Sequence, residues 1–310
     1  MTKLTILQDE SYSKGKKPSE RSVKEKTRFG VVIVNKPCGP SSHEVSAFVK
    51  KILQVEKTGH TGTLDQDVSG VLPVLINDAC KAVPFFIKER KQYVGVMHCE
   101  EEKSFAQIEK VFENFKGKIW QKPPLESAVA KKLRIREVYS LELLEVEGKN
   151  SLFKCDVEGG FYVRKLCTDA GELLGCGAKM AELRRTKAAG FAEKDAVTLQ
   201  DLNDAKWLSD QRKNNSELEK IIHNLEDVTT LKKVIASDDV LKPITTGANL
   251  AIVGINALDK TIRKGEVVQV LTGKGELVCF ATALMNGNTI IENKDGYGLA
   301  FDVLRVIQAF

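Results

Sequence analysis

The sequence lacks the residue patterns that mark metal sites, disulfide frameworks and membrane spans. Its seven cysteines form no Cys-x-x-Cys pair and follow no regular spacing, and the chain has only four histidines. This pattern argues against a zinc site and against a set of disulfides. No apolar run approaches the ~20 residues that a membrane span needs, and residues 1–17 carry too much charge for a secretory signal. We therefore expect a cytoplasmic protein without membrane contacts.

The composition is typical of folded globular domains. Of the 310 residues, 42% are hydrophobic and 29% are charged, which suffices for cores in two domains of ~100–200 residues each. The net charge is only +5, so a polyanion would be held by local basic patches rather than by a uniformly positive surface. Residues 1–28 carry eight Lys or Arg against four Asp or Glu and show no sustained apolar period. We expect this segment to be a flexible basic tail that a partner orders.

Hydrophobic periodicity predicts an α+β body over residues 29–230. The β-branched run Val31–Val34 indicates a strand, and Ser41 with Glu44 forms a capping-box pattern before an amphipathic helix. Further strands and helices follow along the chain, so we expect a central mixed or antiparallel sheet. Over residues 231–310, short β-rich pieces alternate with glycines, which is typical of a small β-barrel.

Two segments of the body carry residues that could support chemistry. The segment from His60 to Gly70 combines a histidine, glycines and hydroxyls with Asp65, whose carboxylate could act as a nucleophile, a base or a metal ligand. By itself, such a segment is most often a turn. On a strand, Tyr162 and Arg164 would face the same side and offer a stacking surface beside a permanent cation. An edge strand with a surface arginine explains this second pattern equally well.

A third segment is strongly basic and follows a Pro-Pro break. It contains Lys131, Lys132, Arg134 and Arg136. A run of this kind is more often a solvated strand edge than a binding patch, although its position in a loop favours contact with phosphates.

Taken together and in order, seven segments resemble the TruB-type pseudouridine synthases, most closely the archaeal and dyskerin-like branch that works inside H/ACA guide-RNA particles. The resemblance covers roughly residues 29–310, and its last segment is similar to the start of a PUA domain. The segments are Asn35–Glu44, Val55–Asp65, Lys91–Gly95, Pro123–Val129, Gly160–Arg164, Ala181–Arg185 and Thr246–Ala251. The resemblance implies a pseudouridine synthase fold with a small PUA barrel.

The resemblance implies that Asp65 is the catalytic aspartate. Its carboxylate attacks the uridine or drives cleavage of the glycosidic bond, and the sequence leaves both routes open. The uracil is then detached at N1, rotated and rejoined to the ribose through C5, without a cofactor or a metal. Such chemistry requires a flipped nucleotide in a closed pocket, because the free base must not be lost to water.

The family also implies roles for residues around Asp65. Arg164 pairs with the aspartate, Tyr93 stacks on the flipped base, and His60 fills the gap that the extruded nucleotide leaves. Tyr162 and Leu183 line the same pocket. Lys36 and Pro37 match the first motif of the family, and we expect them to give structural support near the site.

Two RNA contacts outside the pocket are implied as well. Residues 127–139 fall where the family has its thumb loop, so Lys131, Lys132, Arg134 and Arg136 are expected to contact phosphates as the loop closes over RNA. The PUA-like end implies a second anchor for a guide RNA or for tRNA. One departure from the family pattern, Gln66 in place of proline, puts the rigidity of the Asp65 loop in question.

We therefore expect the catalytic subunit of an H/ACA-type pseudouridine synthase, which acts on rRNA and tRNA with a guide RNA and partner proteins. A stand-alone enzyme for the T-loop uridine of tRNA is the alternative. An inactive RNA-binding scaffold would lack Asp65, Tyr93 or Arg164, and the sequence retains all three. A metal-dependent hydrolase built on His43, His60 and Asp67 would need a ligand spacing that the sequence does not show.

Overall fold

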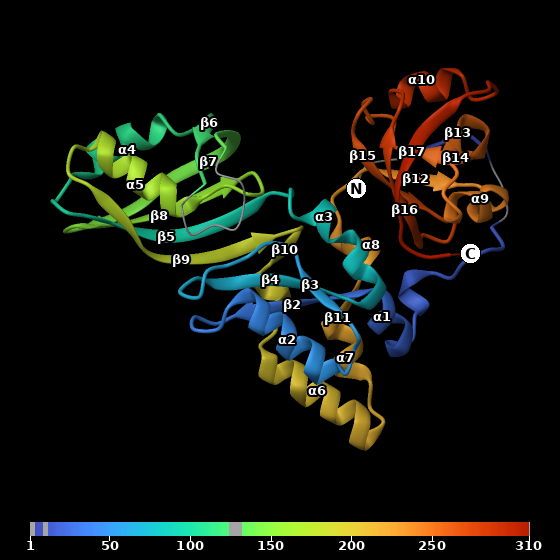
Figure 1. Cartoon of the computed structure of the whole chain (residues 1–310), viewed down its shortest axis with the longest axis horizontal. Helices are drawn as coiled ribbons and strands as arrows, with labels where there is room; N and C mark the ends of the chain where they lie inside the picture. The colour runs from blue at the N-terminus through green and yellow to red at the C-terminus, as the bar shows by residue number, and fades with distance from the viewer. Residues whose placement is uncertain (1–3, 9–11, 124–131, 310) are drawn as a thin grey trace.

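Two β-sheets organise the computed structural model, which describes residues 4–8, 12–123 and 132–309 (Figure 1). In this part of the chain the larger sheet has ten strands, in the order β11-β2-β4-β9-β5-β8-β7-β6, with β3 beside β4 and β10 beside β9. The β4–β9 pair is parallel, while its neighbours β2–β4 and β5–β9 are antiparallel, so the predicted mixed sheet is confirmed. The strands are β2 (Gly30–Lys36), β3 (Thr58–His60), β4 (Ser69–Ile76), β5 (Lys91–Cys99), β6 (Gly117–Gln121), β7 (Arg134–Glu147), β8 (Asn150–Val157), β9 (Ala178–Ala188), β10 (Phe191–Ala192) and β11 (Ile222–Asn224).

The smaller sheet forms the predicted β-barrel, and its own apolar core lies inside it. Its strands are β12 (Lys233–Ala236), β13 (Leu250–Ala251), β14 (Ile255–Leu258), β15 (Val267–Leu271), β16 (Leu277–Ala283) and β17 (Leu299–Val306), joined by β1 (Thr5–Ile6) from the N-terminal segment. Two short helices, α9 (Leu241–Thr245) and α10 (Gly287–Glu292), lie beside these strands. Figure 1 shows the barrel beside the larger sheet.

Helices cover the larger sheet at both of its ends. Figure 1 shows α2 and α6 along β2 and β4, and α4 and α5 beside β7 and β8. The helices are α1 (Val23–Phe29), α2 (Ser42–Leu53), α3 (Val83–Phe86), α4 (Phe105–Glu113), α5 (Val163–Leu173), α6 (Leu199–Arg212), α7 (Ser216–Ile221) and α8 (Leu225–Val228), with the 3₁₀ helix η2 (Asn77–Ala82) before α3. The sequence predicts one continuous helix from residue 78, whereas the chain forms η2 and then the single turn of α3.

The position of strand β2 explains the continuous apolar run Val31–Val34 in its sequence. Val32 and Val34 pack into the core beneath α2, whereas Val31 and Ile33 pack into a second core on the opposite face. All four side chains are fully buried. A strand that is covered on both faces cannot alternate apolar and polar residues, so its sequence reads as an unbroken hydrophobic run.

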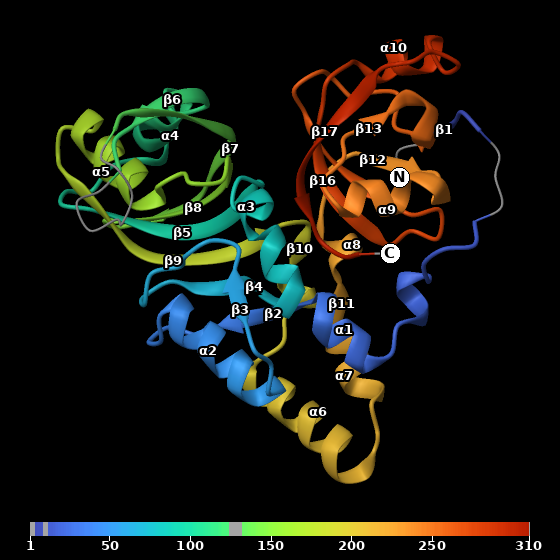
Figure 2. The same ribbon diagram turned by 45° about the vertical axis from the view of Figure 1, so that its right-hand side comes forward.

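The N-terminal segment lies along the barrel rather than extending as a free tail (Figure 2). Thr5 pairs with Leu258 of β14, and the ring of Tyr12 lies so close to Gly273 that a Cβ there would be 1.8 Å from it. The flexible tail predicted over residues 1–28 is therefore wrong for the described residues. Residues 1–3 and 9–11 lie outside the described part of the chain.

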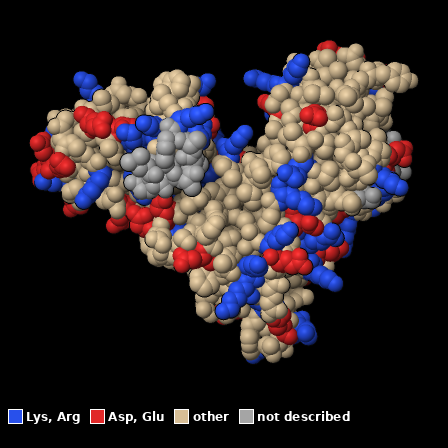
Figure 3. All heavy atoms as spheres, in the orientation of Figure 1, with Lys and Arg blue, Asp and Glu red and all other residues tan. Residues whose placement is uncertain are grey.

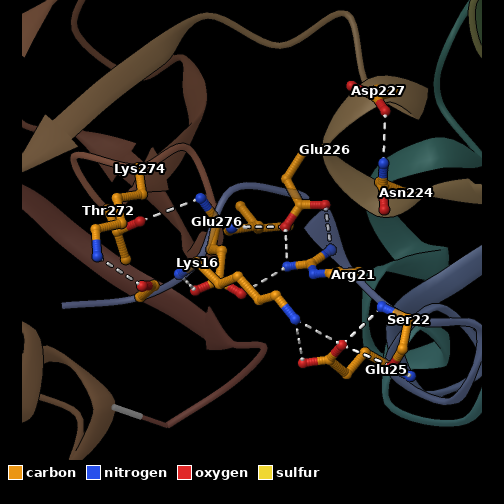
Figure 4. A network of polar contacts seen from close by, with 12 residues as sticks. Lys16, Arg21, Ser22, Glu25, Asn224, Glu226, Asp227, Thr272, Lys274 and Glu276 are labelled. Carbon is orange, nitrogen blue, oxygen red and sulfur yellow. Dashed lines mark hydrogen bonds and ion pairs between the residues drawn. The ribbon is translucent and has the colours of Figure 1, made fainter. Parts of the chain in front are cut away.

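Arg21 holds this segment to both folded parts of the molecule (Figure 4). Its guanidinium donates two hydrogen bonds of 2.8 Å to the carboxylate of Glu226 in α8, and one of 3.2 Å to Glu276 beside β16. The Arg21 side chain is only 2% exposed. Its partners lie 205 and 255 residues away along the chain, so a local charge count assigned this arginine to a solvated tail.

Among the described residues, no helix is long and apolar enough to cross a membrane.

Candidate active site

Asp65 lies in the loop of residues 61–68 that joins the antiparallel strands β3 and β4. The backbone of this loop is held from beneath by the buried Lys36. Its Nζ donates to the carbonyl oxygens of Gln66 at 3.3 Å and Val68 at 2.7 Å. Burial lowers the pKa of Lys36, while the nearby carboxylates of Asp67 and Asp65 act in the opposite direction. The hydrogen bonds of Lys36 go to backbone carbonyls, so it orders the loop backbone.

Other contacts restrain the same loop. Ser42 Oγ donates to the carbonyl of Leu64 at 2.9 Å and accepts from its N–H at 2.8 Å, and Gly39 N–H donates to the carbonyl of Gln66 at 2.8 Å. The carbonyl of Pro37 is a third acceptor for the lysine Nζ, at 3.0 Å. Gln66 thus takes part through its carbonyl, which a proline would also have, so its substitution for proline does not remove these restraints.

Arg164 reaches the site from the first turn of α5, and not from a strand. Gly159 and Gly160 turn the chain out of β8: a Cβ on Gly159 would lie 2.2 Å from the carbonyl oxygen of Ile87, and Gly160 has a φ of +84°. Both positions therefore favour glycine. The predicted strand face shared by Tyr162 and Arg164 is wrong, because Tyr162 is the N-cap of this helix.

The structure brings Asp65 and Arg164 together as an ion pair, with Arg164 Nη2 donating to Asp65 Oδ2. The two residues are 99 positions apart in the sequence. A charge-assisted hydrogen bond of this kind favours the ionised carboxylate and fixes the direction of its oxygens. Both side chains remain open to solvent, with 53% of Asp65 and 41% of Arg164 exposed. The described residues alone therefore do not close a pocket around Asp65.

Tyr93 and Leu183 form a buried floor near the ion pair. They lie on the paired strands β5 and β9 and are 7% and 9% exposed. Burial raises the pKa of Tyr93; the nearby Arg185 opposes this shift, and the Asp65 carboxylate adds to it. The Tyr93 phenol is therefore neutral at physiological pH, and it lies close enough to the Asp65 carboxylate to interact with it electrostatically.

Arg185 is a residue of the site to which the sequence assigned no role. It is fully buried, and its Nε donates to the carbonyl of Val71 at 2.7 Å while Nη2 donates to that of Gly62 at 3.2 Å. Gly70 lies against its backbone, where a Cβ would be 2.2 Å from the Arg185 carbonyl oxygen. The Arg185 guanidinium thus ties β9 to the chain on both sides of Asp65, at Gly62 in the loop and at Val71 in β4. Its position in the Ala181–Arg185 motif was the only available signal.

His60 lies at the end of β3, and its Nε2 is 3.2 Å from Nδ1 of the exposed His43. Burial lowers the pKa of His60, and the charges of His43 and Arg185 act in the same direction. Its Nδ1 is buried without a hydrogen-bond partner in the described residues. This histidine is therefore mainly neutral near pH 7, and it lies at the start of the Asp65 loop with one free ring nitrogen.

The basic residues predicted to form a mobile cover occupy different surroundings. Arg134 and Arg136 belong to β7, which pairs with β6, and Lys132 is exposed just before this strand. Arg136 also forms an ion pair of 3.4 Å with Glu158. These cations are thus presented partly by a strand, because β6 supplies the hydrogen-bond partners that a free loop would lack. Lys131 lies outside the described residues.

Gln121 is a second residue of the site that the sequence did not indicate. It ends β6, is 2% exposed, and clamps the backbone of Tyr162 with two hydrogen bonds. Its Nε2 donates to the Tyr162 carbonyl at 3.1 Å, and its Oε1 accepts from the Tyr162 N–H at 3.0 Å. The clamp therefore positions the start of α5, two residues before Arg164.

We expect Gln121→Leu to lower kcat/KM by about ten- to a hundredfold, because a displaced helix start moves Arg164 away from Asp65. The substitution also leaves two backbone groups of Tyr162 without partners. Lys118→Ala, at an exposed position of the same strand, is the matched control and should change kcat/KM less than twofold. Single-turnover pseudouridine formation measures both variants, and equal rates for the two would show that the clamp does not position the site.

The buried Lys91 lies against the Asp65 loop, and the half-buried Glu89 lies close to it in the chain. Lys91 Nζ donates to the carbonyls of Ile87 at 2.9 Å and Glu89 at 2.8 Å, and its Cε would lie 3.2 Å from a Cβ on Gly62. Burial lowers the pKa of Lys91 to about 8 and raises the pKa of Glu89 to about 7. The fold therefore holds both groups in surroundings that disfavour their charged forms.

The raised pKa of Glu89 predicts a dependence of stability on pH. The folded protein retains a proton on Glu89 up to about pH 7, whereas the unfolded chain loses it near 4.5, so stability falls as pH rises across this window. Glu89→Gln should remove this slope and be more stable than the wild type by about 2 kcal/mol at pH 8, with little difference at pH 4. Urea unfolding at the two pH values measures this, and the exposed Glu142→Gln should show no such difference.

The described residues contain no group of three or more His, Cys, Asp or Glu side chains that could hold a metal ion. His43, His60 and Asp67, the ligands of the hydrolase alternative, form no such group.

Asp65, Arg164 and Tyr93 lie together on a mixed sheet that is joined to a small barrel, as the sequence resemblance to PUA-carrying pseudouridine synthases implies. Four family models match in order: the DKCLD domain over residues 7–46, the N-terminal domain of the TruB family pseudouridylate synthases over 50–163, the C-terminal domain of tRNA pseudouridylate synthase B over 164–230, and the PUA domain over 232–306. The chain belongs to the TruB family and is a pseudouridine synthase.

Known relatives match nearly the whole chain. A probable tRNA pseudouridine synthase B of Methanocaldococcus jannaschii is 47% identical over 96% of this chain and 88% of its own length. The corresponding protein of Archaeoglobus fulgidus is 45% identical over 96% of this chain and 91% of its own. The similarity therefore extends through both folded parts and the N-terminal segment.

Solved structures match to the same extent. A chain from the crystal structure of a Cbf5-Nop10-Gar1 complex has a TM-score of 0.93 and 39% identity, and the match covers 100% of this chain and 95% of that chain. A chain from an H/ACA ribonucleoprotein bound to a substrate RNA containing 2'-deoxyuridine has a TM-score of 0.90 and 37% identity, over 99% and 95% of the two chains. The fold predicted from the sequence is confirmed.

Proposed function

We propose that this chain is the catalytic subunit of an H/ACA guide-RNA-dependent pseudouridine synthase that converts uridine to pseudouridine in rRNA, with tRNA as a second substrate. The observation that carries this proposal is the likeness of the whole chain, from the N-terminal segment to the barrel, to chains that work in H/ACA complexes. The partner proteins would be counterparts of Nop10 and Gar1, and the place of action would be the cytoplasm.

The chemistry we propose starts at the ionised Asp65. The carboxylate attacks the uridine or drives elimination, and either route breaks the bond between C1' of the ribose and N1 of the uracil. The base rotates, C5 bonds to C1', and N1 gains a proton while C5 loses one, so the product is an isomer of the substrate. Arg164 holds the carboxylate in its reactive direction during these steps.

The surrounding residues would retain the base. Tyr93 stacks on the uracil with Tyr162 and Leu183 around it, and His60 fills the space from which the nucleotide was flipped. Because Asp65 is half exposed in the free protein, the bound RNA itself must exclude water from the carboxylate. The basic residues Lys131, Lys132, Arg134 and Arg136 would contact phosphates of this RNA.

A stand-alone tRNA enzyme is the second candidate, and the specific observation in its favour is that the curated relatives are named as probable tRNA pseudouridine synthases. In that case the PUA barrel would bind the tRNA itself instead of a guide RNA. The two activities require the same Asp65 chemistry and differ in how the target uridine is positioned.

Tritium release from 5-labelled uridine separates the two candidates. We expect release from an rRNA fragment only when guide RNA and partner proteins are added together with this chain. Release from tRNA by the chain alone, with none from rRNA under any condition, would establish the stand-alone function instead. A variant in which Asp65 is replaced gives the background for every arm.

A further inference from the structure

The larger sheet consists of two halves that meet along β4 and β9 (Figure 1). Strands β2, β3, β4 and β11 form one half, and β9 with β10, β5, β8, β7 and β6 form the other. Among the described residues, β4 and β9 pair only at Ser69 with Arg184 and at Gly70 with Arg185, whereas β5 pairs with β9 along its whole length. The backbone junction between the two halves is therefore short.

The residues of the candidate site come from both halves of the sheet. Asp65 belongs to the loop between β3 and β4, whereas Tyr93 and Leu183 lie on β5 and β9. Arg164 lies on α5, which follows β8 in the chain and packs against β9. The Asp65–Arg164 ion pair thus crosses from one half to the other. Its geometry therefore depends on how firmly β4 is held to β9.

The side chain of Arg184 reinforces this junction. Its Nη1 donates to Ser69 Oγ at 3.1 Å, and its Nη2 donates to Asn35 Oδ1 at 3.1 Å. Ser69 is the first residue of β4 and directly follows the Asp65 loop. Asn35 lies on β2, one residue before the Lys36 that holds the loop backbone. The guanidinium thus joins β9 to β4 and β2 beside the loop.

A guanidinium suits this position because its donors form a fixed, planar fork. Nε of Arg184 forms an ion pair with Glu193, which follows β10, so its three nitrogens bind three separate segments. A lysine carries the same charge but lacks the fork. Arg185, the next residue, faces the other side of β9 and binds Gly62 and Val71 there. The two arginines therefore hold the segment that carries Asp65 from both faces of the sheet.

We propose that Arg184 is a positioning residue for the isomerisation, which fixes the Asp65 loop of one half of the sheet against Arg164 and Tyr93 of the other. All three nitrogens of its guanidinium bond to protein groups. Arg184 therefore acts through the loop and not by touching the substrate. The inference rests on the proposed function in taking Asp65 as the reacting group.

Direct contact with an RNA phosphate is the alternative role for a partly exposed arginine. The side chains of Arg184 and Glu193 are 39% and 41% exposed. The Glu193 carboxylate offsets the positive charge that a phosphate would meet at this place. On the face that Figure 3 shows, the described residues over β4 and β10 are mainly uncharged, whereas Lys and Arg gather where α1 meets the barrel. These surroundings favour a role in holding the strands.

Replacement of Arg184 tests the proposal. Arg184→Met should lower the single-turnover rate at saturating RNA by about ten- to a hundredfold, because a displacement of reacting groups by about 1 Å has an effect of this size. RNA affinity should stay within about twofold. Arg184→Lys keeps the charge without the fork and should be nearly as slow. Tritium release from 5-labelled uridine in the complete complex measures the rate, and fluorescence anisotropy measures the affinity. Lys179→Met, at an exposed position of β9, is the control and should change neither by more than about twofold.

Ser69 allows a conservative rescue on the other side of the junction. Ser69→Ala removes the hydroxyl that accepts from Arg184 and should lower the rate by about three- to tenfold, whereas Ser69→Thr keeps a hydroxyl and should retain about half of the rate or more. In the Arg184→Met background, Ser69→Ala should cost less than about twofold, because the bond is already absent. Thermal unfolding midpoints should stay within about 3 °C of the wild type, since a partly exposed ion pair contributes little to stability.

An unchanged rate in Arg184→Met would overturn the inference. A wild-type rate in Arg184→Lys would do the same, because charge alone would then suffice. Lower RNA affinity with an unchanged rate at saturation would show that Arg184 contacts RNA instead. Wild-type activity of Asp65→Asn would refute the proposed chemistry and this inference with it, whereas an inactive Asp65→Asn beside a fully active Arg184→Met would overturn this inference alone.

Discussion

Replacing Asp65 with asparagine should abolish pseudouridine formation while leaving RNA affinity within about twofold of the wild type. The proposed chemistry starts at this carboxylate, so we expect a loss of more than about a thousandfold in the single-turnover rate. The fold should survive, because Lys36 and Ser42 bind the backbone of the loop and not the Asp65 side chain. Tritium release measures the rate, and anisotropy measures RNA binding.

The control for this variant is Asp67→Asn, two residues further along the same loop. Asp67 is exposed, and its backbone carbonyl accepts from Cys38 Sγ at 3.3 Å, a contact that the substitution keeps. It removes the same charge from the same surface, so RNA affinity should respond alike in both variants. Product formation near the wild-type rate by Asp65→Asn would refute the catalytic assignment.

Arg21→Met should destabilise the protein by about 3–5 kcal/mol, the largest stability change that we expect from any single substitution here. The guanidinium is nearly inaccessible and is shared by the carboxylates of Glu226 and Glu276. Its removal leaves two buried carboxylates facing each other without a cation. Urea unfolding followed by circular dichroism measures the loss, and hydrogen exchange should rise in β1 and in the adjoining barrel strands.

Two further variants identify the cause of this loss. Lys16→Met removes a neighbouring cation whose ion pair with Glu25 is about half exposed, and it should cost less than about 1 kcal/mol. Combining Arg21→Met with Glu226→Gln and Glu276→Gln removes the unpaired charges and should recover more than half of the stability. A cost below 1 kcal/mol for Arg21→Met alone would mean that the N-terminal segment contributes little to joining the two folded parts.

Short-range features of this fold could be predicted from the residues alone. Ser41 and Glu44 predicted a helix start, and both halves of the capping box are present. The run Val31–Val34 predicted a strand, which β2 contains. These predictions succeed because a cap or a hydrophobic period involves groups only a few residues apart, whose geometry depends little on the rest of the chain. The segment after residue 78 forms η2 and then the short helix α3 instead of one regular helix, and Tyr162 is the N-cap of α5 instead of a strand residue.

Some residues of the candidate site could be predicted from the sequence, and others could not. The motifs identified Asp65, Tyr93 and Arg164 by their resemblance to a family, and the structure places all three around one loop, while their catalytic roles stay predictions. Gln121 and Arg185 could not be given roles from the sequence, because each acts by hydrogen bonding to the backbone of a distant segment. Every residue has a backbone carbonyl, so the residue types in the sequence do not show which carbonyl such a side chain binds.

The chain's residue pattern alone thus indicated its family, predicted its sheet and barrel, and singled out Asp65 as the candidate catalytic residue. The folded arrangement settled how Arg21 anchors the N-terminal segment and how Gln121 and Arg185 hold the backbone around the Asp65 site. The physical reason is that burial and pairing are properties of distant segments brought together. The spacing of hydrophobic residues shows that one face of a helix or strand must be buried. Only the packed structure determines which residues bury it.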